Sequence, residues 1–184
     1  VCGACTVLVD GQPSRSCLMF SAQADGTDIT TIEGLAADDG TPHPIQQAMM
    51  DAHGFQCAFC APGFLMSPLA LLDETPAPPT DEIREELSGN LCRCTGYQRI
   101  VDAIQMVAAV KRGEAMPAAD DSGRVGSSLD RFEGKELALG ARDYVDDMRP
   151  QGMLHGAVRL SEHARARILK IDTEKAEAMP GVVK

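Results

Sequence analysis

The fold is decided by Cys57-Ala58-Phe59-Cys60 and Cys92-Arg93-Cys94, two short stretches of closely spaced cysteines. Each pair lies in a connection between two helical patterns, at or near the start of the second helix. Helix N-termini favour thiolate over thiol, and thiolate is the form of cysteine that binds metals. Four thiolates from two facing loops at one end of a helix bundle are therefore expected to enclose one metal cluster, with Phe59 and Phe64 shielding it from water.

The residues around these loops have a helical pattern from 42 to 112. Four short helices are expected: Pro44–His53, a second that begins after Cys60, a third from Thr80 to Gly89, and a fourth from about Tyr97 to Lys111. In the first helix, Ile45, Ala48 and Met49 give an apolar face at i, i+3 and i+4. Pro68 should kink or restart the second helix. Four such helices bury a core together where none would be stable alone.

The N-terminal region, residues 1–35, is instead rich in strand and turn signals. Thr6–Val9 is a β-branched run ended by Asp10-Gly11, a strong hairpin signal, and Ile29–Ile32 is a second short strand candidate. Residues 113–128 are rich in Gly, Pro, Ala, Asp and Ser without periodicity, which predicts a linker.

The residues after the linker have another pattern. Leu154–Leu160 alternates as a strand, Ile168–Ile171 is a further strand candidate, and Thr173–Met179 reads as a short helix terminated by Pro180-Gly181. This pattern predicts the opening of a mixed α/β domain. The fold class expected for the whole chain is α+β.

A second group of cysteines, Cys2-x2-Cys5-x11-Cys17, lies in the β-rich region. Plant-type [2Fe–2S] proteins use C-x4-C-x2-C and a more distant cysteine, and this group matches that pattern without its first member. We expect that member just before Val1. Gly3 and Ala4 are small enough for backbone N–H groups to approach the cluster sulfides, which raises the reduction potential.

Other chemistry for these cysteines can be weighed by their spacing. A zinc site with four cysteines usually uses two C-x2-C pairs, and Cys92-Arg93-Cys94 departs from that spacing. Disulfides would need an oxidising compartment. Buried free cysteines are an alternative for the first group alone, and a thiol switch using Cys57 and Cys60 leaves the other five cysteines unexplained. The main alternative is a zinc-stabilised interaction module.

Composition excludes several classes of partner. The chain has 184 residues and a formal net charge of −10, which repels nucleic acid and anionic membrane surfaces. No stretch approaches the roughly 18 apolar residues of a membrane span. The chain begins at Val1 beside a cysteine and ends at Lys184 in an apolar run, so we expect a fragment truncated at both ends. We expect a cytoplasmic location, with the periplasm left open because the N-terminus is missing.

Three parts of the sequence together resemble one enzyme family. Cys2–Gly11 with Ser16-Cys17 resembles the ferredoxin-like cluster loop of the xanthine dehydrogenase/aldehyde oxidoreductase family of molybdenum hydroxylases. Gln56–Phe64, followed by Gly89–Tyr97, is similar to that family's helical [2Fe–2S] domain. Gly140–Asp147, Gly152–Gly156, Ser161–Ile171 and Ala178–Val183 resemble the start of its large molybdopterin-binding part.

The resemblance implies a domain plan. Residues 1–35 would be the C-terminal remnant of a β-grasp ferredoxin-like domain, 42–112 a four-helix [2Fe–2S]-binding domain, 113–128 a linker, and 129–184 the start of the molybdopterin-binding α/β hammerhead domain. No flavin domain lies between the iron–sulfur and molybdenum parts, so FAD is not expected in this chain.

The resemblance also implies a function. A molybdenum–molybdopterin centre in the parent enzyme would hydroxylate an aldehyde or an N-heterocycle with oxygen from water. Electrons would pass to a cluster held by Cys57, Cys60, Cys92 and Cys94, and then to one held by Cys2, Cys5, Cys17 and a missing cysteine.

The expected partners are the rest of the molybdopterin-binding portion and an external acceptor, which could be a flavin subunit, cytochrome or other carrier. Cys94 would lie against the pterin, and Gln56 would either contact the pterin or form a loop hydrogen bond. This chain contains none of the expected catalytic residues, so alone it should carry electrons and hydroxylate nothing.

Overall fold

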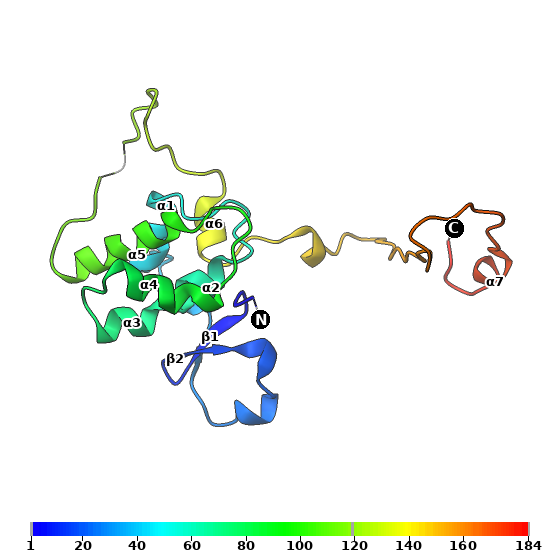
Figure 1. Ribbon diagram of the computed structural model, residues 1–184, viewed down its shortest axis with the longest axis horizontal. Helices are drawn as coiled ribbons and strands as arrows, with labels where there is room; N and C mark the ends of the chain where they lie inside the picture. The colour runs from blue at the N-terminus through cyan, green and yellow to red at the C-terminus, as the bar shows by residue number, and fades with distance from the viewer. Residues whose placement is uncertain (1, 119, 184) are drawn as a thin grey trace. The chain divides into compact units, whose positions relative to one another are not determined.

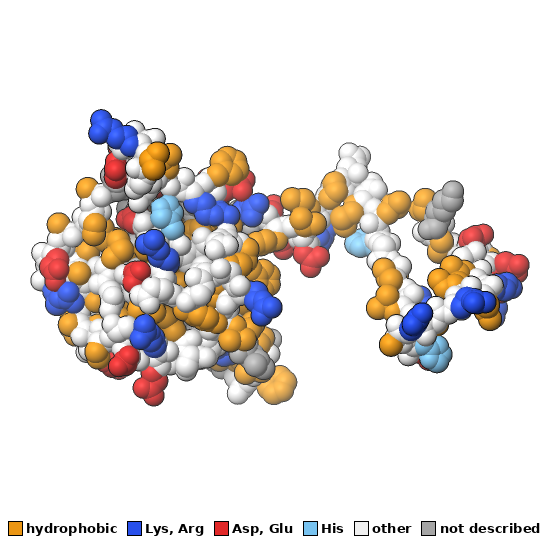
Figure 2. All heavy atoms as spheres, turned by 45° about the horizontal axis from the view of Figure 1, so that its top comes forward, with side chains coloured by type: hydrophobic (Ala, Val, Ile, Leu, Met, Phe, Trp, Pro, Cys, Tyr) orange, Lys and Arg blue, Asp and Glu red, His pale blue; other side chains and the backbone are white. Residues whose placement is uncertain are grey.

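The computed structural model describes residues 2–118 and 120–183, which form two compact units that divide between Asp146 and Asp147 (Figure 1). The first unit contains a small sheet and most of the helices. None of the described helices is both long enough and apolar enough to cross a lipid bilayer. Basic and acidic side chains are interspersed on the visible face of the first unit (Figure 2).

The sheet has three antiparallel strands in the order β2-β1-β3, with β1 at Thr6–Val9, β2 at Gln12–Arg15 and β3 at Ile29–Thr30. Asp10 and Gly11 join β1 to β2 with φ values of 49° and 80°. Two central residues with positive φ form the turn that matches the twist of a hairpin, so the predicted hairpin is confirmed. The second strand candidate forms only at its first two residues.

The predicted helices are all present. The α-helices of the first unit are α1 (Pro44–Asp51), α2 (Ala61–Met66), α3 (Pro68–Glu74), α4 (Thr80–Glu86), α5 (Gln98–Lys111) and α6 (Gly134–Ala138). Short 3-10 helices are η1 (Ser16–Leu18), η2 (Ser21–Gln23), η3 (Ile32–Gly34), η4 (Leu87–Gly89) and η5 (Val145–Asp147). Pro68 restarts the helix, because as the first residue of α3 its missing N–H costs nothing.

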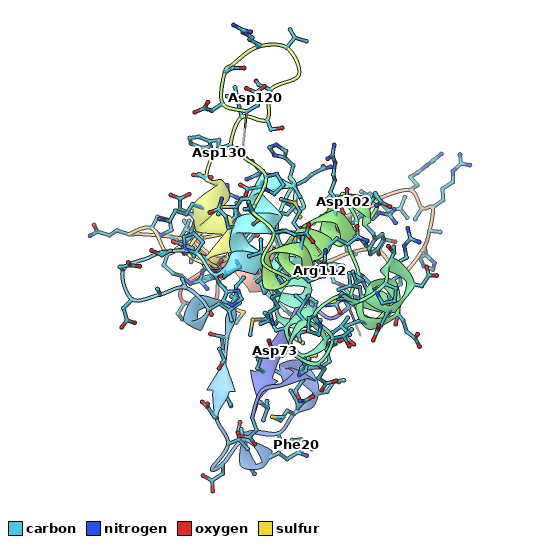
Figure 3. The ribbon with its side chains drawn as sticks, turned by 90° about the vertical axis from the view of Figure 1, so that its left-hand side faces the viewer. Phe20, Asp73, Asp102, Arg112, Asp120 and Asp130 are labelled. Carbon is cyan, nitrogen blue, oxygen red and sulfur yellow. The ribbon has the colours of Figure 1, made fainter. Side chains whose placement is uncertain are left out.

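The core of the first unit lies among these helices. The longest helix, α5, packs against α1 and α4, while α2 contacts β1 and α3 contacts β2. Ile100, Ile104 and Val107 on α5 are buried, as the predicted apolar face requires, and Phe64 on α2 is buried beside them. Phe20, by contrast, is 79% exposed at the end of the β region away from the helices (Figure 3).

The residues that follow the linker also contribute to this core. Leu137 and Ala138 of α6 are buried, and α6 packs against α1 and α2. The compact units therefore divide later than position 129, where the sequence predicts a new domain. The units are defined by packing and do not test the assignment of 129–184 to a family domain, which stays a prediction.

The two strands predicted in the C-terminal part are wrong. The structure has no strand at Leu154–Leu160 or Ile168–Ile171, and among residues 147–183 the regular helix is α7 at Glu174–Glu177. A strand requires a neighbour to pair with, and these residues have none in the described chain. Leu154 and Ile168 are 67% and 77% exposed, so their alternating pattern is not buried. The short helix after Thr173 is confirmed.

Candidate metal centre

The second cysteine set is brought together by two connections between helices. Cys57 and Cys60 lie between α1 and α2, and Cys92 and Cys94 lie between η4 and α5. The Sγ atoms of Cys57 and Cys94 are 3.6 Å apart, and Cys60 and Cys92 lie close enough that each thiol shifts the pKa of the other. The four thiols therefore meet as two pairs, and each pair takes one cysteine from each loop.

This pairing bears on the kind of metal that the thiols would hold. A mononuclear zinc site needs four ligands around one ion. Among residues 2–118 and 120–183, no group of three or more His, Cys, Asp or Glu side chains is placed to hold one ion. Two thiol pairs match a cluster with two iron atoms, each of which takes two protein ligands. The donor set therefore fits a [2Fe–2S] cluster.

The backbone of both loops is tightly turned. Ala58 has a φ of 61°, and the Ala61 N–H donates to the Ala58 carbonyl over 2.9 Å. In the other loop, Tyr97 has a φ of 71°, and its hydroxyl accepts a hydrogen bond from the Cys92 N–H at 3.1 Å. Positive φ is uncommon for residues other than glycine, so both loops hold strained turns that position the thiols.

Gln56 links the two loops directly. Its Nε2 donates to the Cys94 carbonyl over 3.1 Å, so the loop hydrogen bond that the sequence allowed is present. A contact of Gln56 or Cys94 with a pterin stays a prediction. Both residues are exposed, which leaves this edge of the loops accessible.

The four thiols differ in acidity. Burial raises the pKa of Cys60 to about 12, and the neighbouring Cys92 and Cys57 add to the effect. Burial also raises the pKa of Cys92, but hydrogen bonds from the Thr95 hydroxyl and from the N–H groups of Cys94 and Thr95 outweigh it, so the pKa of Cys92 is lowered. Since thiolate is the binding form, Cys92 is the better-prepared ligand of this pair.

The first cysteine set is only partly assembled. The Cys17 backbone N–H donates to the Cys5 sulfur and lowers the pKa of Cys5, while the hydrogen bond between the two thiols raises the pKa of Cys17. Cys2 and Cys17 are exposed. The Cys2 carbonyl accepts a hydrogen bond from the Leu91 N–H at 2.8 Å, so the first cysteine loop touches the second set.

Tyr144 contacts the loop of Cys57 and Cys60, which the residue pattern did not predict. Its hydroxyl donates to the Cys57 carbonyl over 2.8 Å, and its ring packs edge-on against Phe59 with centroids 5.8 Å apart. Phe59 itself is 66% exposed, whereas Phe64 is buried and packs against Tyr97. Tyr144 lies in the Gly140–Asp147 stretch that carries part of the family resemblance, which was the available signal.

A close approach of two glycines holds the first loop on the helices. A Cβ atom on Gly63 of α2 would overlap the Gly3 carbonyl oxygen and would lie 2.7 Å from Nδ2 of Asn90. We expect Gly63→Ala to lower the free energy of unfolding by about 3 kcal/mol, because backbone cannot yield as a flexible side chain does. Urea unfolding followed by circular dichroism measures this change.

Gly34→Ala is the matched control for this substitution. A Cβ on Gly34 would meet only the Thr30 methyl group at an ordinary 3.6 Å. Its unfolding free energy should stay within about 0.5 kcal/mol of the parent chain. Equal losses in both variants would contradict the close packing of Gly63.

Two family models match this chain. Residues 31–105 match a [2Fe-2S] binding domain, and residues 139–184 match the a/b hammerhead domain of aldehyde oxidase and xanthine dehydrogenase. The first match contains all four cysteines of the second set. The second match contains Tyr144.

Individual proteins with similar sequences include components of two bacterial enzymes. The chain is 55% identical over 104 residues to the nicotine 6-hydroxylase small subunit of Paenarthrobacter nicotinovorans, covering 56% of this chain and 62% of that protein. It is 47% identical over 111 residues to one of the subunits of nicotinate dehydrogenase from Pseudomonas putida, covering 60% of this chain and 70% of that protein.

A solved structure extends the similarity to the whole chain. The aldehyde oxidoreductase from Desulfovibrio desulfuricans matches with a TM-score of 0.82 and 39% identity, covering 100% of this chain and 21% of that one. This chain thus spans about a fifth of that enzyme and less than two thirds of the nicotine 6-hydroxylase small subunit. By these matches, the chain belongs to the xanthine dehydrogenase/aldehyde oxidoreductase family.

Proposed function

We propose that this chain is the iron–sulfur, electron-transfer portion of a molybdenum hydroxylase that oxidises an aldehyde or an N-heterocycle with oxygen from water. The observation that carries this proposal is the meeting of four thiols in two pairs, Cys57 with Cys94 and Cys60 with Cys92, inside the matched [2Fe-2S] binding domain. The names of two relatives, nicotine 6-hydroxylase and nicotinate dehydrogenase, supply the N-heterocycle as a substrate class.

Seven cysteines would hold the two clusters. Cys57, Cys60, Cys92 and Cys94 would supply all four ligands of one [2Fe–2S] cluster, with each thiol pair on one iron. Cys2, Cys5 and Cys17 would supply three ligands of a second cluster, whose fourth ligand would come from outside this sequence. A bound cluster supplies one-electron chemistry.

The chain's own residues would position these clusters and limit the access of water. Gln56 ties the two loops of the second set together, and Tyr97 holds the Cys92 backbone. Tyr144 fixes the Cys57 carbonyl and packs beside Phe59 over the same loop. These bonds go to the backbone and would hold the ligand loops in place. Hydrogen bonds to ligand sulfurs tune the reduction potential, and the Thr95 hydroxyl, 3.1 Å from the Cys92 sulfur, would act in this way.

The remaining parts of the chain would follow the family plan. We interpret the β2-β1-β3 sheet as the remnant of a β-grasp ferredoxin-like domain. Residues 42–112 would be the helical [2Fe–2S]-binding domain beside it, in which Pro68 divides the second of the four expected helices into α2 and α3. Residues 129–184 would open the molybdopterin-binding portion, toward which Cys94 and Gln56 would face. The partners would be the rest of that portion and an external electron acceptor, such as a flavin subunit, cytochrome or other carrier, and the proposed location is the cytoplasm.

Metal analysis tests this proposal against the zinc-stabilised module. The chain is purified without oxygen, reconstituted with iron and sulfide, reduced with dithionite, and measured for iron, zinc and low-temperature EPR. We expect red-brown protein with about two iron atoms in the second set and a [2Fe–2S] signal. Colourless protein that binds zinc and rejects iron would overturn the electron-transfer function and favour the zinc module.

A further inference from the structure

Asn90 is a buried polar side chain of the first unit and is only 2% exposed. Its Nδ2 donates to the Gly3 carbonyl over 3.3 Å. Its Oδ1 accepts hydrogen bonds from the Ser67 hydroxyl at 3.0 Å and from Arg15 Nη2 at 3.2 Å. One amide therefore joins the first cysteine loop, strand β2 and the junction of α2 with α3.

Arg15 completes a network around this amide. Its Nη1 donates to the Thr6 hydroxyl over 2.7 Å, and that hydroxyl in turn donates to the Gly3 carbonyl over 2.6 Å. Arg15 Nη2 also lies 3.3 Å from the Gly89 carbonyl. The Gly3 carbonyl thus receives three donors: the Thr6 N–H at 3.1 Å, the Thr6 hydroxyl, and Asn90 Nδ2 from the loop that precedes Cys92.

The two loops also approach each other without room for another atom. A Cβ on Gly3 would lie 2.6 Å from the Gly89 carbonyl oxygen and 2.7 Å from Asn90 Nδ2. Next to this contact, the Leu91 N–H donates a hydrogen bond to the Cys2 carbonyl at 2.8 Å, which joins the backbones of the two loops. The contact connects residues that are 87 positions apart in the sequence.

We propose that Asn90 is a positioning residue that fixes the Cys2–Cys5 loop against the Cys92–Cys94 loop. An apolar side chain of similar size would fill the same space, but it would leave the Gly3 carbonyl, the Ser67 hydroxyl and Arg15 without this partner. Only the purpose of the contact rests on the proposed function: passage of electrons between two clusters depends steeply on their separation, and this contact would keep that separation constant.

The replacement Asn90→Asp separates this role from general packing. Asp has nearly the same volume as Asn, and its carboxylate still accepts from Ser67 and Arg15, but it cannot donate to the Gly3 carbonyl. We expect exchange of the Thr6 and Leu91 amide hydrogens, measured by mass spectrometry, to become about tenfold faster. Amides of α5, such as that of Ile104, should keep their exchange rates.

Three further variants make the result decisive. Asn90→Ala should lower the melting temperature. Asn90→Asp should have the melting temperature of the parent chain, but the amides of the first cysteine loop should still exchange fast. A merely structural role would change the melting temperature and the exchange rates together. Ser67→Ala, which leaves the bond to Gly3 in place, should keep that loop protected. Gly3→Ala loosens the same contact from the other side and should expose the same amides as Asn90→Asp.

The measurements use the metal-free chain, so they do not depend on the outcome of the iron analysis. Unchanged exchange at Thr6 and Leu91 in Asn90→Asp would overturn the positioning role. Equal acceleration throughout α5 would also overturn it, because Asn90 would then serve the stability of the whole unit. Iron uptake by Asn90→Asp should match that of the parent chain, since every cysteine remains.

Discussion

Replacing Cys92 with Ser is expected to reduce the iron bound by the second cysteine set from about two atoms per chain to nearly none. Cys92 has a lowered pKa because hydrogen bonds from Thr95 and two backbone N–H groups outweigh the effect of burial. A serine hydroxyl in the same place stays protonated and offers no thiolate. Cys60 would already supply one of the four ligands, so it does not replace the one that is lost. Iron analysis and the EPR signal of the reduced protein measure the change.

Cys17→Ser is the matched control for this loss. Cys17 is exposed and belongs to the other cysteine set, in which its thiol is hydrogen-bonded to that of Cys5. The signal of the second set should therefore survive in this variant. A chain that keeps its full iron content after Cys92→Ser would contradict the assignment of Cys92 as a ligand.

The second large effect concerns Gln46, which is completely buried. Its Nε2 donates to the carbonyls of Ile32 and Ala138 over 3.3 and 3.0 Å, and its Oε1 accepts from the His43 N–H at 2.8 Å. Gln46→Met keeps the length of the side chain but removes all three hydrogen bonds. We expect the free energy of unfolding to fall by about 4 kcal/mol, since each buried group left without a partner costs about 1–3 kcal/mol.

The neighbouring residue provides the control for this prediction. Gln47 is hydrogen-bonded to Asp51 at 2.8 Å on the same helix, and both are partly exposed, so water replaces the lost bond in Gln47→Met. The control should change the free energy of unfolding by no more than about 0.5 kcal/mol. Chemical denaturation of the two variants under one condition measures the difference, and equal losses would contradict the role of Gln46.

Local signals explain which parts of the fold could be predicted from the sequence. Three predicted features depend only on residues that are close together in the sequence. They are the Asp10-Gly11 hairpin, the restart of the helix at Pro68 and the apolar face of α5. The same holds for the positions of the second cysteine set at the two helix connections. The wrong strands after Leu154 show the limit of such signals, because an alternating pattern does not supply a partner strand.

Long-range contacts explain what the sequence could not predict about the candidate site. Nothing in the spacing of the cysteines indicates that Cys57 pairs with Cys94, or Cys60 with Cys92, because the pairing depends on how two loops face each other. The contacts of Tyr144 with Cys57 and of Asn90 with Gly3 each join residues 87 positions apart. Such contacts are fixed by packing of the complete unit.

The hydrogen bond from Gln46 to Ala138 has a consequence for synthesis of the protein in the cell. The two residues are 92 positions apart, and α6 supplies the acceptor carbonyl. A chain leaves the ribosome from its N-terminus. Helices α1 to α5 therefore emerge before the Ala138 carbonyl, which accepts a hydrogen bond from the buried Gln46 amide, has been synthesised. The last step in closing this core therefore waits for translation to pass residue 138.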